Sequence, residues 1–316
     1  MTQVSLYTAN LAHGANTGGG YDYANQANIL SSADIVGAQE VTPGDLSSWD
    51  IAFTANGFNS AIYFPNSSGP NNTGDGQAIW YRASKVTLLQ AYSHQLSTGF
   101  ISWDGSTNVD KSAVAVKVAV ANRSFIIVNT HLCWSRCADT QADIETTGYS
   151  RQRVAQINEL LAWIDTEFSD YVGRVVLLAD MNFTPAFLRQ PSGYQIDLLT
   201  VNYTDLWQQG LVSGRAFAEW GDRDNDGIPD MPLGNLTTRT ADKRRVDYIF
   251  LSNNSTILSL DRIEVPDLRV QCPNALVFDG GNFPSCSPVR WQWDVTDDYG
   301  VRPSDHNWVK TVLTIH

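Results

Sequence analysis

The chain is built from short apolar runs, and many of them end in a polar residue. Each run has the length of a strand, and several are rich in Val and Ile, which strands prefer. The expected strands are 3–9, 34–39, 58–64, 76–82, 86–96, 113–121, 124–131, 173–180, 245–251, 257–265 and 307–315. Unpaired polar groups are costly inside a protein, so a buried strand should stay apolar. The polar endings therefore predict one shared site at the edge of a sheet core.

Two segments have the spacing of helices instead. Residues 23–31 follow a Gly-rich turn at 18–20, and residues 149–168 carry apolar side chains at helical intervals. The apolar positions of the longer segment are Val154, Ile157, Leu160, Leu161 and Ile164. Many strands with few helices predict two packed sheets flanked by helices.

Length and charge narrow the possibilities. The 316 residues show no internal repeat and no linker with a shift in composition, so we expect a single domain over 1–316. The formal net charge is −12, which argues against a broad nucleic-acid footprint and against tight adhesion to an anionic membrane. It leaves open an enzyme that grips nucleic acid locally around a metal ion. No run is apolar for long enough to span a bilayer.

The cysteines and glycosylation triplets favour an exported protein. Proximity alone pairs Cys133 with Cys137 and Cys272 with Cys286, with free thiols and a metal site as the alternatives. Neither pair has the two-residue spacing of a zinc knuckle. Asn-x-Ser/Thr triplets are frequent and begin, among other positions, at Asn66, Asn71, Asn122, Asn202, Asn235, Asn253 and Asn254. No signal peptide is visible, because the chain opens directly on a strand-like run. We nevertheless expect a secreted protein that acts as a monomer.

The residue types at the strand ends suit phosphodiester hydrolysis, which needs a metal, an activated water, donors for the transition state and a proton source. Glu40 is a natural ligand for Mg²⁺ or Mn²⁺. Asp180 can orient the attacking water, and the amides of Asn10 and Asn182 can donate to phosphate oxygens. Each of these residues alone would be a plain turn or a solvated acid, so their order along the chain carries the weight.

Histidines complete the candidate chemistry. His131 and His306 can hold or transfer protons near neutral pH. Asp305, next to His306, or Asp247 can fix an imidazole tautomer by accepting its N–H. Asp247 interrupts an apolar run, which makes it harder to explain as a simple turn.

The chain resembles the endonuclease/exonuclease/phosphatase superfamily, which includes deoxyribonuclease I, abasic-site endonucleases, neutral sphingomyelinases and inositol-polyphosphate 5-phosphatases. The resemblance covers nearly the whole chain, because the motifs occur in the family's order from the first strand to the last. They are Asn10, Gln39-Glu40, Thr130-His131-Leu132, Asp180-Met181-Asn182, Arg245-Val246-Asp247-Tyr248-Ile249 and Ser304-Asp305-His306.

The resemblance implies an α/β (α+β) fold, a four-layer α-β-β-α sandwich of two packed mixed β-sheets flanked by helices. It implies a divalent-metal phosphoesterase in which Glu40, Asn10 and Asp305 hold a catalytic Mg²⁺. The catalytic set it implies is His131, Asp180, Asn182, Asp247, Asp305, His306, Asn10 and Tyr81. Lys111 falls where deoxyribonucleases carry an Arg that contacts phosphate.

The sequence also departs from the family. Ala179 replaces the usual Gly before the Asp-x-Asn motif, and the stretch before His306 is longer than the family needs. We interpret the segment near 266–304 as an aromatic, disulfide-containing insertion whose Trp291 and Trp293 bind substrate by stacking on bases, lipid or sugar. The alternative is a small structural subdomain around a disulfide.

A second metal signal lies in another insertion, near 219–237. Acids at alternate positions before a Gly converge on one ion in calcium loops. The expected calcium ligands are Asp222, Asp224, Asp226, Ile228 and Asp230. The twelfth position is Leu233 rather than Glu, so the loop is more similar to the calcium repeats of thrombospondin type 3 modules than to an EF-hand. We expect structural Ca²⁺ here, against the alternative of a solvated acidic turn.

The expected function is a secreted divalent-metal-dependent phosphodiesterase, with a deoxyribonuclease I-like nuclease first and a sphingomyelinase or phospholipase C-like lipid enzyme as the close rival. An inositol-phosphate phosphatase fits less well, because no dense Lys/Arg cluster lies near the motifs. A non-catalytic binding module also fits less well, since Glu40, His131, Asp180 and His306 are all present.

Overall fold

The architecture comes from a computed structural model of the chain. It describes residues 2–14, 21–66, 75–96, 110–133, 151–183, 193–218, 246–265 and 308–316. The predicted calcium loop at 219–237 and the predicted aromatic insertion at 266–304 lie outside these ranges.

The strands form two sheets. The first contains β1 Thr2–Asn10, β2 Ile35–Val41, β3 Asn59–Pro65, β4 Gly76–Tyr81, β10 Ala216–Ala218, β12 Leu258–Val265 and β13 Val309–Ile315. Its seven strands lie in the order β10-β12-β13-β1-β2-β4-β3. The second contains β5 Thr87–Leu96, β6 Lys111–Val120, β7 Arg123–His131, β8 Val175–Asp180, β9 Tyr203–Asp205 and β11 Asp247–Ser252. Its six strands lie in the order β5-β6-β7-β8-β11-β9.

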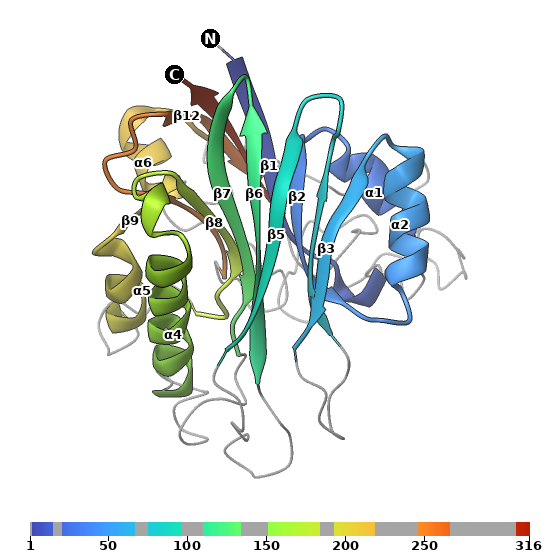
Figure 1. Cartoon of the computed structure of the whole chain (residues 1–316), viewed down its shortest axis with the longest axis horizontal. Coiled ribbons are helices and arrows are strands. Elements are labelled where there is room, and N and C mark those ends of the chain that lie inside the picture. The colour runs from blue at the N-terminus through green and yellow to red at the C-terminus, as the bar shows by residue number, and fades with distance from the viewer. Residues whose placement is uncertain are drawn as a thin grey trace, which may run out of the picture.

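Both sheets are mixed, and their parallel pairs bring strand ends together. β1 runs parallel to β2 in the first sheet, and β7 runs parallel to β8 in the second. The first and last strands, β1 and β13, pair antiparallel, so the two termini lie close together (Figure 1).

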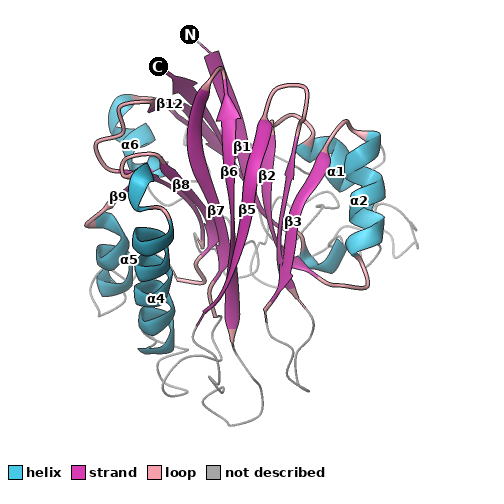
Figure 2. Cartoon of the chain, in the orientation of Figure 1, coloured by secondary structure: helices cyan, strands magenta, loops and turns pink. Residues whose placement is uncertain are grey.

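Helices cover the outer faces of the two sheets. The helices are α1 Tyr23–Leu30, α2 Leu46–Ala55, α4 Arg151–Glu167, α5 Gly193–Thr200 and α6 Leu206–Ser213, with single turns η1 Ala12–Gly14 and η3 Ser169–Tyr171. Figure 2 shows α1 and α2 on one side of the strands and α4 and α5 on the other. The predicted four-layer sandwich is therefore confirmed.

Three apolar clusters hold the layers together. The central cluster lies between the sheets and includes Val4, Ile79 and Val116. A second cluster packs α4 and α5 on β5–β8, and a third packs α1 and α2 on the first sheet. Close contact between the sheets needs Gly37, since a Cβ there would lie 2.7 Å from Leu178 Cδ1. The described part of the chain thus has one apolar cluster between the sheets and one beneath each layer of helices.

The expected strands and both expected helices are confirmed, with ends that differ by a few residues. The sequence pattern missed α2, α5 and α6, each of ten residues or fewer, and the three-residue strands β9 and β10. Short elements carry too few periodic positions to be recognised. Within the described ranges, none of the helices combines the length and apolar character that a membrane crossing requires.

Candidate active site

The space between the sheets changes from apolar to polar at one end. Side chains alternate between the two faces of a strand. On β1, Val4 and Leu6 enter the central apolar cluster, and the next inward positions are Thr8 and Asn10. The other strands change in the same way near this end. Their buried polar residues are Gln39, Gln77, Ser112, Asn129, His131, Asp180 and Asp247.

Strand register brings the predicted site residues side by side. Asn10 pairs with Gln39 across β1 and β2, one residue before Glu40. His131 pairs with Asp180 across β7 and β8, and Asp180 pairs with Asp247 across β8 and β11. The separate polar endings in the sequence therefore belong to one cluster.

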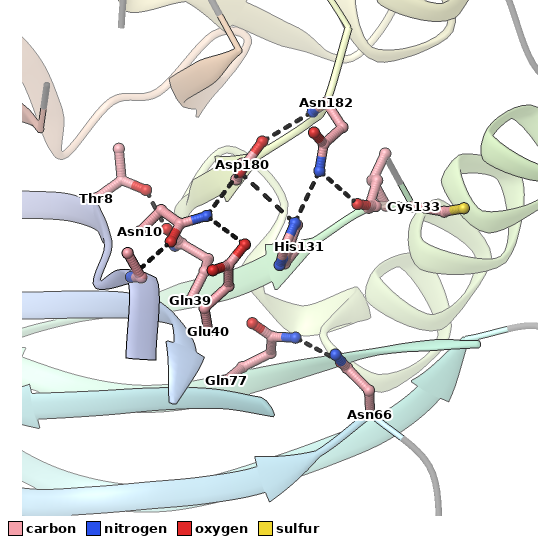
Figure 3. Close-up of polar contacts among 12 residues, drawn as sticks. Thr8, Asn10, Gln39, Glu40, Asn66, Gln77, His131, Cys133, Asp180 and Asn182 are labelled. Atoms are coloured by element: carbon pink, nitrogen blue, oxygen red, sulfur yellow. Dashed lines mark hydrogen bonds and ion pairs between the residues drawn. The ribbon is translucent and has the colours of Figure 1, made fainter. Parts of the chain in front are cut away.

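Asn10 links the two sheets at this cluster. Its Nδ2 donates to Glu40 Oε1 and to Asp180 Oδ2, each at 3.0 Å, as Figure 3 shows. Its Oδ1 accepts from the backbone N–H of Ala12 at 3.0 Å. The carboxylates of Glu40 and Asp180 therefore come within about 6 Å of each other, since both contact one nitrogen atom. A single buried amide thus holds two acids in one place.

Asn182 orients His131. Its Nδ2 lies 2.7 Å from His131 Nε2 and donates to Leu132 O at 2.9 Å (Figure 3). The amide cannot be reversed, because its oxygen would then face the carbonyl oxygen of Leu132. His131 Nε2 is therefore an acceptor here, with Asp180 Oδ2 at 3.6 Å. Asp180 Oδ1 in turn accepts from the Asn182 backbone N–H at 2.9 Å.

The backbone is unusual at three of these positions. Glu40, Asn182 and Ala12 have φ angles of 57°, 51° and 45°, in the left-handed region that non-Gly residues rarely adopt. Glu40 also lies at an irregularity where the pairing of β2 with β4 shifts between Ala38 and Val41. Such strain persists where the surrounding structure holds it, and it is concentrated at functional sites.

The structure adds a buried amide network that the sequence motifs did not predict. Asn129 Nδ2 donates to Ala38 O and Ala78 O of the opposite sheet, and its Oδ1 accepts from Gln39. Gln77 Nε2 donates to Asn66 Oδ1 at 2.7 Å. The signal in the sequence was a lone polar residue at an inward position of an apolar run, as at Gln77 and Asn129.

Two predicted residues do not join the cluster. Tyr81 pairs with Ile35, at the beginning of β2, whereas Gly76 at the other end of β4 pairs with Val41. Five residues of strand separate Gly76 from Tyr81, or about 17 Å. The prediction that Tyr81 belongs to the site is therefore wrong, because β4 runs antiparallel to β2.

Lys111 is displaced for a different reason. Ser112 shares its face of β6 with Val114, which belongs to the cluster between the sheets. Lys111 alternates with Ser112 and shares the face of Ala113, which packs in the cluster beneath α4. The strand pleat thus places Lys111 on the opposite face from His131, and the structure does not bring it into the cluster.

Several other predicted residues lie outside the described residues. They are Asp305, His306, Trp291 and Trp293, and the calcium ligands Asp222, Asp224, Asp226, Ile228 and Asp230. Cys133 is buried and disulfide-bonded, and its expected partner Cys137 lies outside the described ranges. The pairing of Cys133 with Cys137 stays a prediction.

A two-sheet sandwich with acids, amides and a histidine at one end of its core is the arrangement of a phosphoric ester hydrolase. The chain matches the model of the Endonuclease/Exonuclease/phosphatase family over residues 7–306, and it belongs to that family. Enzymes of this family are phosphodiesterases and phosphatases that generally use divalent metal ions. A comparison with curated protein sequences finds no match.

Solved structures of the same fold come from distant relatives. The human Nocturnin catalytic domain with bound sulfate is 16% identical, with a TM-score of 0.59 and coverage of 99% of this chain and 94% of its own. A mannosyl-6-phosphatase from Bacteroides thetaiotaomicron is 17% identical, with a TM-score of 0.63 and coverage of 99% and 100%. Zebrafish (D. rerio) TDP2 with a single-strand DNA product is 16% identical, with a TM-score of 0.55 and coverage of 99% and 100%. At these identities the likeness establishes the fold alone.

The donor set fits a hard divalent ion. Glu40 and Asp180 supply carboxylate oxygens, the ligands that Mg²⁺ and Mn²⁺ prefer. Gln77 Oε1 is a further oxygen, fully buried and without a hydrogen-bond partner. Among the described residues, no group of three or more His, Cys, Asp or Glu side chains is placed to hold a metal ion. A complete metal shell therefore needs amide oxygens, water, or Asp305 from outside those residues.

Proposed function

We propose that this protein is a divalent-metal-dependent phosphodiesterase with deoxyribonuclease I-like nuclease activity. The observation that carries the proposal is the hydrogen-bonded set of Glu40, Asn10 and Asp180 beside His131 and Asn182. These side chains are held by strand ends and by one another, as a preorganised active site requires. Glu40 and Asn10, together with Asp305, would hold Mg²⁺ or Mn²⁺, which supplies charge neutralisation at the phosphate oxygens.

The remaining side chains divide the proton and positioning work. Asp180 accepts two hydrogen bonds from Asn10 and Asn182, which fix its carboxylate and suit it to orient an attacking water. His131 Nε2 accepts from Asn182 Nδ2, which holds the imidazole ring in a fixed orientation beside Asp180. The amide N–H groups of Asn10 and Asn182 already donate to partners within the site, so we assign both residues to positioning Glu40, Asp180 and His131 rather than to binding phosphate oxygens. We assign proton transfer with the leaving group to His306 and a supporting carboxylate to Asp247.

Nucleic acid is the proposed substrate, although the chain is acidic. The DNA-bound relative TDP2 shares the fold, and a site built around a metal ion does not need a broad basic surface. The net charge of −12 leads us to expect weak binding with a shallow salt dependence, because few Lys or Arg side chains would neutralise phosphates.

The full chain should be tested on supercoiled plasmid, RNA, sphingomyelin vesicles, a chromogenic phosphodiester and a chromogenic phosphomonoester, each with Mg²⁺ or with chelator. We expect plasmid nicking and diester hydrolysis that require the metal. Asp180→Asn should reduce the rate by about 10²–10⁴-fold. Asp261→Asn is the matched control, because Asp261 is an exposed acid that accepts from Gln3 on the surface.

Comparison of the five substrates distinguishes a nuclease from the other activities. Cleavage of sphingomyelin alone would indicate a lipid phosphodiesterase of the sphingomyelinase or phospholipase C type instead of a nuclease. Hydrolysis of the monoester alone would indicate a phosphatase. No activity on any of the five substrates would contradict the enzyme proposal itself.

We also propose that the protein is exported, acts as a monomer and carries structural Ca²⁺ on the loop at 219–237. The support is the alternating acids of that loop and the paired cysteines. Calcium should raise the melting temperature of the wild type and not that of Asp224→Ala. A melting temperature that changes with neither calcium nor chelator would contradict the proposed calcium site.

A further inference from the structure

Arg153 is a fully buried charged residue behind the candidate active site. It lies in the first turn of α4 and is 1% exposed. Its Nη1 donates to Cys133 O at 3.0 Å and to Asn182 O at 2.9 Å. Its Nε donates to Gln195 Oε1 of α5 at 3.1 Å. One guanidinium therefore joins two helices to two segments of the second sheet.

The two carbonyl groups belong to the segments that carry the site. Cys133 lies two residues beyond His131, at the end of β7, and Asn182 lies two residues beyond Asp180, at the end of β8. Asn182 has a φ of 51°, so its backbone is held in a conformation that a non-Gly residue rarely adopts. Arg153 contacts the carbonyl of this same residue. The guanidinium is thus placed to hold the strained peptide that aims the Asn182 amide.

The Asn182 amide is the group that Arg153 would affect. The side-chain Nδ2 of Asn182 contacts His131 Nε2 at 2.7 Å. The backbone N–H of Asn182 donates to Asp180 Oδ1. A second residue of α4 supports the same region, because Gln156 Oε1 accepts from the Cys133 backbone N–H at 3.1 Å. A small movement of the Asn182 peptide would therefore change the environment of both His131 and Asp180.

Packing alone does not explain a buried arginine at this position. Burying a charge costs several kcal/mol, and apolar residues often replace buried ion pairs without loss of stability. The inward neighbours Ile157 and Leu160 of the same helix are apolar. The planar fork of Arg holds the two carbonyl oxygens through Nη1 and Gln195 through Nε at the same time. An apolar side chain lacks these donors, and the single flexible nitrogen of Lys does not reproduce their fixed geometry.

We propose that Arg153 is a positioning residue, which sets the Asn182 side-chain amide on His131 by holding the Asn182 carbonyl. The proposal rests on the proposed function for its kinetic test, and on the Asn182 contacts for a second test without substrate. Arg153 does not touch the substrate, so its loss should slow the reaction more than it weakens binding.

The kinetic test is a double-mutant cycle on the full chain with the plasmid or diester substrate. We expect Arg153→Met to lower kcat by about 30-fold with KM within about threefold, and Asn182→Ala to lower kcat by about 100-fold. If Arg153 acts through Asn182, the double variant should also lose about 100-fold rather than the product of the two losses. If the double variant instead shows the product of the two single-variant losses in kcat, the proposal is wrong.

Two further variants separate positioning from folding. Arg153→Lys keeps the charge but loses the fork, so it should recover thermal stability and leave most of the kcat loss. Ile164 lies on the buried face of α4, near the other end of the helix. Ile164→Val should therefore reduce stability with little change in kcat. If Arg153→Lys recovers kcat in proportion to stability, the role of Arg153 is structural and the proposal is wrong.

The second test uses nuclear magnetic resonance without substrate, and so does not depend on activity. The side-chain amide signals of Asn182 and the ring nitrogen signals of His131 should shift in Arg153→Met. They should stay unchanged in Ile164→Val. If the wild type were inactive on all substrates, the proposed function would fail while these shifts still decided the positioning role. Unchanged Asn182 and His131 signals in Arg153→Met would overturn it.

Discussion

Asp180 and Asp247 are direct partners on the neighbouring antiparallel strands β8 and β11, and each is only 1% exposed. Partner side chains on one face of such a pair lie about 5 Å apart at Cβ, and like charges in that relationship destabilise a sheet. The fold thus holds two acids together inside the protein, where a chain selected for stability alone would place apolar residues.

This pairing predicts how the protein responds to metal. A divalent ion that binds only the folded state at 100 times its Kd adds about 2.7 kcal/mol of stability. An ion held by Glu40 and Asn10 would adjoin Asp180, so much of that gain should come from its attraction for the two close acids Asp180 and Asp247. The rise in Tm caused by Mg²⁺ should therefore be at least halved in Asp247→Asn, measured by melting in Mg²⁺ and in chelator. An equal rise in wild type and Asp247→Asn would contradict the prediction, and Asp261→Asn serves as the surface control.

We expect the site to depend on the hydrogen-bond donors of Asn10 rather than on the size of its side chain. Its Nδ2 contacts both Glu40 and Asp180, so Asn10→Asp replaces a shared donor with a third acid of the same size. We expect activity to fall by at least about 100-fold and Tm in chelator to fall by several degrees. Added Mg²⁺ should restore more Tm to this variant than to wild type. A variant that keeps wild-type activity would show that the donor role is wrong.

The close approach of the sheets at Gly37 predicts a stability change away from the chemistry. A methyl group there would lie 2.7 Å from Leu178 Cδ1 and 3.1 Å from the Asn129 side chain. Overpacking of this kind costs about 1–3 kcal/mol, so Gly37→Ala should lower the urea midpoint. Leu178→Val should recover part of that loss when combined with Gly37→Ala. Simple addition of the two single-variant losses would show that the contact with Leu178 is not the cause.

Alkaline pH should destabilise the fold partly through Tyr23. Burial, and then the hydrogen bond to Asp45, raise the pKa of Tyr23 to about 12 from its ordinary value of 10.0. The folded state therefore favours the neutral phenol. The stability that neutral Tyr23 contributes to the folded state is complete below pH 10 and is lost as the pH rises toward 12. Tyr23→Phe should lower the free energy of unfolding by about 1 kcal/mol below pH 10, through the lost hydrogen bond.

The same variant should flatten the dependence of stability on pH between 10 and 12. Urea unfolding at several pH values in this window measures the slope. A slope equal to that of the wild type would assign the alkaline sensitivity to other groups. Tyr63, whose pKa is also raised to about 12 by burial and Asp75, is the next residue to test.

Most of the fold could be predicted from the order of apolar runs. Val/Ile-rich segments such as 113–121 and 124–131 are long enough to identify strands, and residues 149–168 are long enough to identify a helix. Helices as short as α5 could not be found, because their few periodic positions resemble any mixed segment. Part of the site was also visible, since Asn10, Glu40, His131 and Asp180 lie at or near the ends of strands and Asn182 follows one.

The linear order of residues therefore determined the strands, the polar residues at their ends and the family of enzymes to which the chain belongs. Tertiary structure alone decided which of those residues meet, because contact depends on strand direction and register. An antiparallel β4 moves Tyr81 to the far end of the sheet and brings in Gln77, and the pleat of β6 turns Ser112 inward instead of Lys111. Arg153 is invisible in the motifs, because its role arises only where α4 crosses the ends of β7 and β8.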